Sequence, residues 1–531
     1  MSTKQSVTFK NTGYFSKIIC DYLEEKESVQ NFYNHFPDLN GFKKQIELRS
    51  EKNNKLDRKA LVRTLRTQYK NISTSKGTEN NIALLQKENT FTVTTGHQLN
   101  LFTGPLYFLY KIISTINLTT QLKKEFPENN FVPIYWMATE DHDFEEIQYF
   151  NFQGKKIKWR RAAAGAVGRL DTKGLDQVFN DFSTKLGISK NAEAIKTLFK
   201  RSYLEHNNLA DATRFLANEL FSTHGLVILD ADNKDLKKRF IPFIKEELID
   251  QTSFKEVSKT VVLLEQSYKI QVNPREINLF YLDDDLRERI IYEDGIYRIN
   301  NANLSFSKGA MLKMVEDSPE KFSPNVLLRP LYQEVILPNL CYIGGGGELA
   351  YWFELKKYFE AVDVPFPILL LRNSAVLCTS KQVKKMERLN ISKEDIFIGQ
   401  NKLINKKIKD ISEINIDFSG QRLQLEKMFD ELKILSNQTD RSFLGAVKAQ
   451  EKKQMNGLNK LEKRLLKAQK RKMKEVVDRI TTLQDQIFPN QSLQERNTNF
   501  SEFYLNYGES LIPVLFDALK PLELKLDLIE I

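Results

Sequence analysis

Four ionisable side chains stand side by side directly after an apolar run of the chain. Glu140, Asp141, His142 and Asp143 follow the segment FVPIYWMAT at 131–139. Adjacent acidic groups at the end of a strand repel one another unless a cation, an amine or shared protons meet them. A bound ammonium group, a pair of ribose hydroxyls or Mg²⁺ would serve, and a solvated acidic turn is the alternative. A zinc site is not expected, because no second His or Cys lies nearby at ligand spacing.

A turn between a strand pattern and a long apolar helix carries a second set of candidates. Gly96 permits a sharp exit from the strand, and Gly104 with Pro105 suits the start of a helix, where proline loses no hydrogen bond. The first turn of a helix has free amides and a partial positive charge, so a phosphate or carboxylate can bind there. Side-chain donors in the same turn are His97, Gln98 and Asn100. A plain helix cap with polar loop residues is the alternative.

The stretch GGGGELAYW at 344–352 places four glycines between a predicted strand and a predicted helix. Glycine lets a ligand approach the backbone closely, so Gly345 and Gly346 are candidate binding residues, with Glu348 at the start of the helix. The stretch matches neither the dinucleotide fingerprint nor the phosphate loop, and a flexible connection is the alternative. Other polar candidates near predicted strand ends are Asn325, Arg329, Gln333, Arg372, Ser374 and Lys381.

The segments that position these motifs alternate between strand and helix patterns. A β-branched run at 90–95, a helix at 105–126 and an apolar strand at 131–139 predict a β-α-β unit. Such a unit implies a parallel sheet with its ligand site at the carboxyl ends of the strands. Further buried strands are predicted at 225–232, after residue 339 and at 365–377. Because each motif follows a predicted strand, we expect all of them at one edge of an α/β sheet.

The chain, at 531 residues, is long enough for several domains, and its patterns divide it into five ranges. These are 1–146 (first part of the sheet core), 147–310 (an inserted α/β domain), 311–385 (second part of the core), 386–490 (a helical arm) and 491–531 (a segment returning to the core). Within the insertion, a hairpin turning at Gly154 and Lys155 and short antiparallel strands over 277–306 are predicted.

The arm contains a predicted helix of about 40 residues over 444–487. Its apolar stripe, which includes Leu465, Met473 and Ile480, predicts coiled-coil pairing. The partner is either a helix around 421–436 of the same chain or the arm of another subunit. We predict a homodimer formed through this stripe.

The net charge of +10 is concentrated in the arm, because residues 451–475 alone carry +7. A nucleic-acid-binding protein that uses this basic helix is one alternative function, and a scaffold that uses it for assembly is another. The helix lacks the aromatic side chains that stack on bases, and lysines on a long helix usually form a solvated face. We therefore expect no nucleic-acid partner.

The composition is that of a globular protein, with 41% hydrophobic and 28% charged residues. No segment reaches the roughly 20 uninterrupted apolar residues of a membrane span, and the first residues lack a secretory h-region. The three cysteines are far apart in the sequence and fit a reducing compartment. A cytoplasmic protein without membrane contact is expected.

Four motifs, taken in order, carry a resemblance to a known family. The motifs extend from about residue 92 to residue 508 and are TTGHQLNLFTGPLYFLYK, PIYWMATEDHDFEEI, FSPNVLLRPLYQEVILPNLCYIGGGGELAYW and FPNQSLQERNTNFSEFYLNYG. They resemble the successive signatures of the cysteine-adding enzymes of bacillithiol biosynthesis. That resemblance implies a Rossmann-like parallel-sheet core related to class I aminoacyl-tRNA synthetases, an inserted α/β domain, a coiled-coil arm and a homodimer.

The resemblance also implies a ligase that joins cysteine to the glucosamine amine of glucosaminyl-malate. Because a carboxylate is a poor electrophile, we expect ATP to activate it, with Mg²⁺ as a possible companion and no resident protein metal. Expected catalytic residues are Asp141, His142 and Glu348, with Glu348 or His142 taking the proton released by the attacking amine. Expected nucleotide-binding residues are Gly96, His97, Gln98, Asn100, Gly104 and Lys381. Expected substrate-binding residues are Glu140, Asp143, Asn325, Arg329, Gln333, Gly345, Gly346, Arg372 and Ser374.

Overall fold

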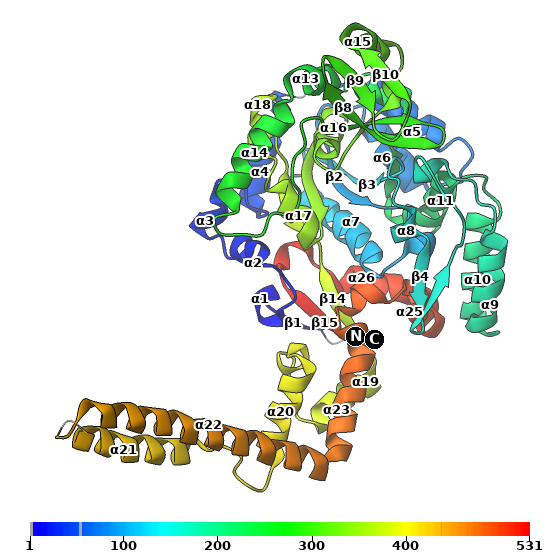
Figure 1. Ribbon diagram of the computed structural model, residues 1–531. Helices are drawn as coiled ribbons and strands as arrows, with labels where there is room; N and C mark the ends of the chain where they lie inside the picture. The colour runs from blue at the N-terminus through cyan, green and yellow to red at the C-terminus, as the bar shows by residue number, and fades with distance from the viewer. Residues whose placement is uncertain (1–3, 53–55, 437) are drawn as a thin grey trace.

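A five-stranded parallel sheet forms the centre of the molecule, as a computed structural model that describes residues 4–52, 56–436 and 438–531 shows (Figure 1). The strands in spatial order are β13 (Ile368–Leu371), β12 (Asn339–Gly344), β2 (Thr90–His97), β3 (Asn130–Met137) and β6 (Val227–Asp230). All four pairs of neighbours run parallel. The predicted α/β class with a parallel sheet is confirmed.

The β-α-β unit lies where the sequence predicts it. The helix between β2 and β3 is α7 (Tyr107–Glu125), which packs against β2, β3 and β12. It begins two residues after Pro105, whose carbonyl accepts a hydrogen bond from the amide of Phe108 at 3.0 Å. Strand β2 continues to His97 rather than ending at residue 95, so the histidine stands at the last position of the strand.

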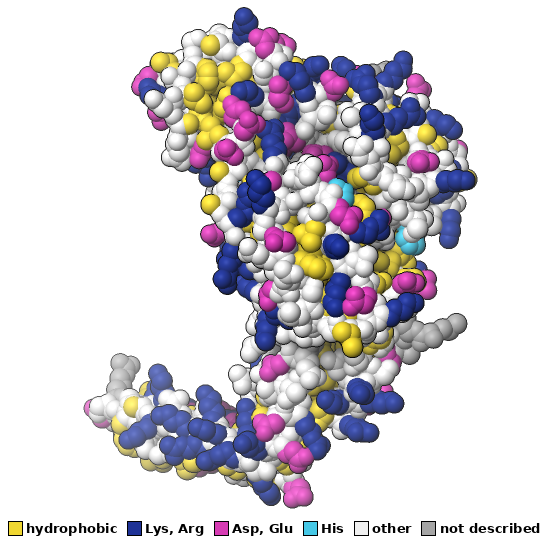
Figure 2. Space-filling model, turned by 90° about the vertical axis from the view of Figure 1, so that its right-hand side faces the viewer, with side chains coloured by type: hydrophobic (Ala, Val, Ile, Leu, Met, Phe, Trp, Pro, Cys, Tyr) yellow, Lys and Arg dark blue, Asp and Glu magenta, His cyan; other side chains and the backbone are white. Residues whose placement is uncertain are grey.

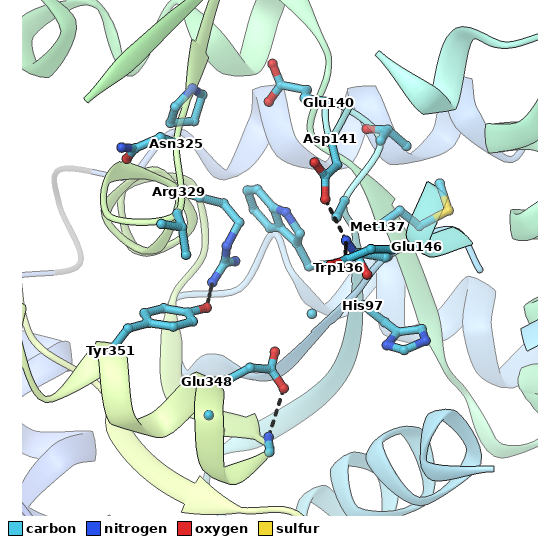
Figure 3. A pocket seen from close by; sticks show the side chains of 18 of the residues that line it. His97, Trp136, Met137, Glu140, Asp141, Glu146, Asn325, Arg329, Glu348 and Tyr351 are labelled. Atoms are coloured by element: carbon cyan, nitrogen blue, oxygen red, sulfur yellow. Dashed lines mark hydrogen bonds between the residues drawn. The ribbon is translucent and has the colours of Figure 1, made fainter. Parts of the chain in front are cut away.

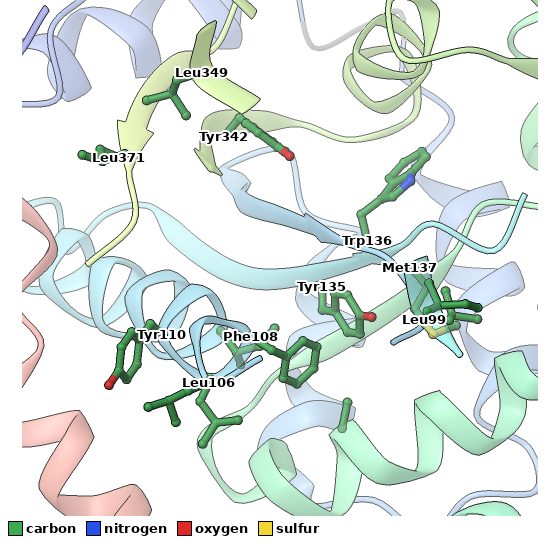
Figure 4. Packing of buried hydrophobic residues seen from close by; sticks show 14 of the residues in the cluster. Leu99, Leu106, Phe108, Tyr110, Tyr135, Trp136, Met137, Tyr342, Leu349 and Leu371 are labelled. Carbon is green, nitrogen blue, oxygen red and sulfur yellow. The ribbon is translucent and has the colours of Figure 1, made fainter. Parts of the chain in front are cut away.

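Large apolar side chains from α7 and the sheet form the main hydrophobic core (Figure 4). Phe108 and Tyr135 pack edge to face with ring centroids 5.4 Å apart, and both are buried. Burial of one such side chain contributes about 1.5–3 kcal/mol, so the core fixes the helix on the sheet and, with it, the loop that precedes the helix.

Several predicted elements differ from the structure. The run at 365–377 is not one strand: the chain turns at Arg372 and Asn373, and β14 (Ser374–Cys378) leaves the central sheet. Strand β14 pairs in parallel with β15 (Leu526–Glu530), which in turn pairs antiparallel with β1 (Lys4–Val7). The two ends of the described chain therefore meet in one three-stranded sheet.

The range 147–310 is likewise not one uninterrupted insertion, because β6 lies inside it and pairs with β3 in the central sheet. The predicted hairpin is confirmed as β4 (Tyr149–Phe152) and β5 (Lys155–Lys158). The predicted antiparallel strands form a second five-stranded sheet with β11 (Phe322–Pro324) at one edge. Its other strands are β7 (Leu279–Asp283), β8 (Leu286–Glu293), β9 (Ile296–Ile299) and β10 (Leu304–Ser307).

Helices surround these sheets. Those of the N-terminal region are α1 (Phe9–Thr12), α2 (Lys17–Leu23), α3 (Glu27–Gln30), α4 (Leu39–Glu51), α5 (Arg58–Gln68) and α6 (Lys76–Leu84). Between β3 and β11 lie α8 (Phe144–Ile147), α9 (Leu175–Leu186), α10 (Lys190–Tyr203), α11 (Leu209–Phe221), α12 (Lys234–Lys237), α13 (Ile241–Asp250), α14 (Thr252–Leu264) and α15 (Lys308–Asp317). Around β12 lie α16 (Leu328–Ile336), α17 (Gly346–Trp352) and α18 (Lys356–Ala361).

The arm is a helical hairpin that projects away from the core (Figure 1). Helix α21 (Ser419–Ser436) packs against α22 (Arg441–Lys472), with ion pairs Lys433–Glu451 at 2.8 Å and Arg422–Glu462 at 2.6 Å. The predicted single helix over 444–487 is instead two helices, because the backbone changes direction at Met473 before α23 (Lys474–Ile487). The base of the arm is formed by α19 (Ser380–Arg388), α20 (Gln400–Ile411) and α23.

The segment after the arm returns to the core, through α24 (Gln494–Asn497), α25 (Phe500–Tyr507) and α26 (Leu511–Ala518). Across the described ranges, we find no helix that combines the length and the apolar character required to cross a membrane.

Candidate active site

The carboxyl ends of β2, β3 and β12 open into a cavity of about 710 Å³. Helices α16 and α17 and the antiparallel sheet complete its walls. The sequence-predicted residues that line it are Gly96, His97, Gln98, Glu140, Asp141, His142, Asn325, Arg329, Gly345, Glu348 and Arg372 (Figure 3). The structure thus brings the three strand-end motifs together, although they lie far apart in the sequence.

Seven predicted residues lie outside the lining of this cavity, and most have structural contacts instead. Asp143 caps α8, Ser374 starts β14 and Lys381 lies exposed on α19. Asn100 donates to the carbonyl of Glu146 at 3.3 Å and packs against Gly104, whose φ of +61° favours glycine. The other two are Gln333, which lies behind Arg329, and Gly346, which packs against Ile19.

A buried ion pair joins the first and third strand-end motifs. Lys111 Nζ lies 2.6 Å from Glu348 Oε2 and donates to the carbonyl of Gly96 at 2.7 Å. Glu348 also accepts from the Tyr342 hydroxyl at 2.7 Å and from the Gly345 amide at 2.8 Å. This carboxylate is therefore held by three donors, and Lys111 connects α7 to both β2 and α17.

The ion pair changes the expected role of Glu348. Burial alone would raise the pKa of Glu348, but Lys111, the Gly345 amide and the Tyr342 hydroxyl together lower it to about 2. A carboxylate with so low a pKa is a weak proton acceptor at neutral pH. The expectation that Glu348 acts as a catalytic base is not supported by this geometry, and we assign it instead to positioning Lys111 and Tyr342.

The acidic motif after β3 is held by Gln98. Its Nε2 donates to Asp141 Oδ2 at 2.8 Å and to Glu146 Oε2 at 2.9 Å. Although burial would raise the pKa of Asp141, hydrogen bonds from His142 and Gln98 hold it well below its ordinary value. Asp141 is therefore a fixed negative charge on one side of the cavity.

His142 is turned toward the antiparallel sheet. Its Nδ1 lies 2.7 Å from Arg287 Nη1, and the Arg287 guanidinium stacks over the ring of Phe280 at 4.0 Å. Because a guanidinium only donates, Nδ1 must accept, and the proton of the neutral imidazole then sits on Nε2. His142 is thus a hydrogen-bond donor in this arrangement, not the proton acceptor expected from the sequence.

Glu140 and His97 are poorly suited to a direct chemical role in the reaction. Glu140 contacts the buried Lys237, and its pKa is raised because burial outweighs that contact. Burial, assisted by the nearby Lys111, lowers the pKa of His97 to about 3, so this imidazole is uncharged at neutral pH. It packs against the rings of Tyr107 and Phe108. His97 can donate a hydrogen bond but offers no positive charge to a phosphate.

Three further arginines line the cavity. Arg372 is tied to the buried Glu495 at 2.8 Å and stacks over Tyr107. Arg329 contacts the aromatic rings of Trp136 and Tyr342, and Arg496 comes from the segment after the arm. Within the described ranges, no carboxylate forms an ion pair with Arg329 or Arg496. These two side chains are the positive charges most available to an anionic ligand.

The loop between β2 and α7 is strained and is held by the C-terminal segment. Phe102, Thr103 and Gly104 have φ values of +48°, +67° and +61° in succession. Asn499 Nδ2 donates to the carbonyls of Phe102 and Gly104 at 2.7 and 2.6 Å. The amide of Gly104 donates to Leu101, and that of Leu106 donates to Thr498. Because these amides already have partners, the phosphate site expected around Gly104 is not supported.

Sequence reasoning missed Lys111, Arg287 and Arg496. Lys111 carried a visible signal, because it is a lone charge in the apolar run LYFLYKIIS. Arg287 and Arg496 arrive from distant segments and carry no local signal. Among the residues that the structure describes, no group of three or more His, Cys, Asp or Glu side chains is arranged to hold a metal ion.

Comparison with known proteins agrees with this architecture. The family model described as "Bacillithiol biosynthesis BshC, N-terminal Rossmann-like domain" matches residues 1–373, and that of the "C-terminal coiled-coil domain" of BshC matches residues 375–531. The chain is 58% identical to a protein of Flavobacterium johnsoniae, covering 99% of each chain. It is 59% identical to one from Flavobacterium psychrophilum and 57% to one from Christiangramia forsetii, each with 97% coverage of both chains.

All three relatives carry the name "Putative cysteine ligase BshC". The Rossmann-like fold, the cavity at the strand ends and these relatives define an enzyme of the ligase class. The chain belongs to the BshC family of bacillithiol biosynthesis.

Proposed function

We propose that this enzyme forms an amide between the carboxyl group of cysteine and the glucosamine amine of glucosaminyl-malate. The observation that carries the proposal is the separation of charge across the cavity: Asp141 and Glu146 lie on one side and Arg329 on the other (Figure 3). An acidic wall suits the ammonium group of cysteine, and an arginine suits the malate carboxylates. The family membership supports the same substrates. We place the reaction in the cytoplasm, consistent with three free cysteines.

The proposal includes activation of the cysteine carboxylate by ATP, because hydroxide is a poor leaving group from an acyl carbon and AMP or phosphate is a good one. A carboxylate oxygen attacks the α-phosphorus and expels pyrophosphate to give an acyl-adenylate, or attacks the γ-phosphorus and expels ADP to give an acyl phosphate. Arg329 and Arg496, whose charges face the cavity and which form no ion pair within the described chain, fit the anionic groups of the substrates, one for the malate carboxylates and one for the phosphates. Attack by the neutral glucosamine amine then forms the C–N bond and expels phosphate or AMP. The amine proton leaves to water or to a phosphate oxygen, because Glu348 and His142 are poorly suited to accept it.

The test is to incubate the purified protein with cysteine and glucosaminyl-malate, with and without ATP, and to follow products by mass spectrometry. We expect the thiol product only when ATP is present, together with AMP from an adenylate. ADP in place of AMP would indicate an acyl phosphate. Equal product without nucleotide would overturn the activation step but not the substrates, and no product under any condition would overturn the substrate assignment.

We also propose that the arm forms a homodimer, through a different surface from the one expected. Ile480 is fully buried within its own chain, and Leu465 and Met473 pack against the same core, so that stripe is already covered. Exposed apolar side chains lie on α22, at Phe443 and Leu461, and on α21, where Met428, Leu432 and Leu435 are 47%, 36% and 55% exposed. The i, i+4, i+7 spacing of the last three places them on one helix face. Figure 2 shows hydrophobic side chains exposed along the edge of the arm.

Replacing Met428, Leu432 and Leu435 together by glutamate is expected to convert a dimer into a monomer in sedimentation analysis. Three charges on that face would have to be buried without partners in a dimer, which opposes association. Ile188→Glu provides the control, because Ile188 is 94% exposed on the core, far from α21 in the chain. A triple variant that stays dimeric would show that the arm face is not the interface.

A further inference from the structure

Arg329 is held in place by neutral groups. Its Nη1 donates to Gln333 Oε1 at 3.0 Å, and its Nη2 lies 3.5 Å from the Tyr351 hydroxyl. Its guanidinium carbon is 5.4 Å from the centre of the Tyr342 ring. Arg372 on the same cavity is, by contrast, neutralised by Glu495. The structure thus orients one arginine without cancelling its charge.

The orientation of the Gln333 amide is determined by a hydrogen bond to Glu334. Gln333 and Glu334 are fully buried, and Gln333 Nε2 donates to Glu334 Oε1 at 2.9 Å. The same oxygen accepts from Asn339 Nδ2 at 2.7 Å, and Asn339 Oδ1 accepts from the Thr94 hydroxyl at 2.8 Å. Because Glu334 Oε1 accepts from both amide groups, their NH2 ends must point to it. The Gln333 carbonyl is therefore forced toward Arg329.

This arrangement does not depend on whether Glu334 is ionised. Burial raises the pKa of Glu334 to about 7, with Arg49 opposing that shift. Its other oxygen, Oε2, is buried and has no hydrogen-bond partner among the residues that the structure describes. A proton on Oε2 would leave Oε1 free to accept from both amides, so the direction of the Gln333 amide is the same in either state.

We propose that Gln333 and Glu334 are positioning residues that keep Arg329 fixed and positively charged for the anionic group of a substrate. This inference rests on the proposed function and explains why an amide stands at position 333 and a carboxylate at position 334. A carboxylate at position 333 would also accept from Arg329, but it would neutralise that charge, compete with the substrate and have no donor to offer Glu334. An amide orients it without that competition, and the acidic group is moved one hydrogen bond further away.

The test compares KM for each substrate with kcat in four variants. Gln333→Glu is expected to raise KM for an anionic substrate, glucosaminyl-malate or ATP, by roughly tenfold to a hundredfold, since a charge-assisted hydrogen bond is lost. KM for cysteine and kcat should change by less than about threefold, a difference small on the same free-energy scale. Gln333→Leu should raise the same KM less, because orientation is lost but the charge remains.

Glu334 provides a rescue test. Glu334→Leu removes the acceptor of both amides and should raise the same KM, whereas Glu334→Gln retains an acceptor oxygen and should stay near the wild-type value. Gln424→Glu, at an exposed position on α21, is the matched charge control. Melting temperatures identify any variant that fails to fold. Unchanged KM values in Gln333→Glu, or equal increases for all substrates, would overturn the inference.

Failure of the proposed function would be visible separately, because the wild-type enzyme would then make no product. In that case crystal structures of the wild type and Gln333→Leu decide the inference. A displaced Arg329 guanidinium in the variant supports the positioning role, and an unmoved guanidinium overturns it.

Discussion

Replacing Lys111 by methionine is expected to destabilise the enzyme by about 3–5 kcal/mol at pH 7, the range for removing one partner of a buried ion pair. The side chain of Lys111 is 4% exposed, and its loss leaves Glu348 ionised and without its cation. The carbonyl of Gly96 also loses its donor. Methionine keeps most of the volume of the lysine stem, so the effect reports charge rather than a cavity. Urea denaturation at pH 7 measures it.

The deficit should shrink in acid, because it depends on the ionised carboxylate. In the wild type, the pKa of Glu348 is lowered from 4.5 to about 2, so its stabilising contribution is present above pH 4.5 and is lost as pH falls toward 2. In the variant, burial is no longer opposed by Lys111, and protonation at low pH relieves the unpaired charge. The free energies of unfolding of the wild type and the variant should therefore lie closer together at pH 4 than at pH 7. Lys124→Met, at the exposed end of α7, is the control; a deficit independent of pH would contradict the explanation.

Replacing Asn499 by alanine is expected to cost about 2–5 kcal/mol and most of the activity, because two buried carbonyls lose their donor. These carbonyls belong to Phe102 and Gly104, in the loop whose backbone has three successive positive φ values. Once released, the loop is expected to relax and to move Gln98, which orients Asp141. Asn499 also caps α25, so its loss loosens the start of that helix.

Hydrogen exchange separates a local effect from a global one. Amides over 100–106 should exchange faster in Asn499→Ala, with loss of turnover, while amides of β12 stay protected. Asn506→Ala removes an exposed asparagine from the same helix and should leave both measurements unchanged. Normal activity in Asn499→Ala would show that the strained loop does not need this clamp.

The sequence was sufficient to predict the parallel sheet and the place where its motifs meet. Strand and helix patterns are local, and a β-α-β unit has one favoured handedness, so β2, α7 and β3 follow from the residues themselves. The partners of a strand are not local. The run at 365–377 is apolar on both sides of Arg372 and Asn373, and only distant β15 determines that its second half leaves the central sheet. The pairing of β6 is also not local, because its partner β3 lies about 90 residues earlier in the chain.

The candidate site was predictable in its position more than in its roles. Residue types at strand ends located Asp141, Arg329 and Glu348 around one cavity. The partners that determine their chemistry come from elsewhere: Lys111 keeps Glu348 ionised, and Arg287 fixes the tautomer of His142. The apolar stripe of the arm was recognised correctly as a packing surface, but periodicity does not distinguish a partner helix within the chain from one in another subunit.

The position of β15 between β1 and β14 has a consequence for the order of folding during translation. Strand β1 precedes β15 in the chain, and among the described strands it pairs only with β15, so it cannot be paired in this sheet until residues 526–530 have left the ribosome. Glu495 and Asn499, which hold Arg372 and the strained loop, also emerge late. A nascent chain can build the β-α-β unit early, but the cavity at the strand ends stays incomplete until residues 495–530 have been made. Chains that lack residues 495–530 should therefore be inactive, and folding of the final sheet should be slow, as expected for contacts between distant segments.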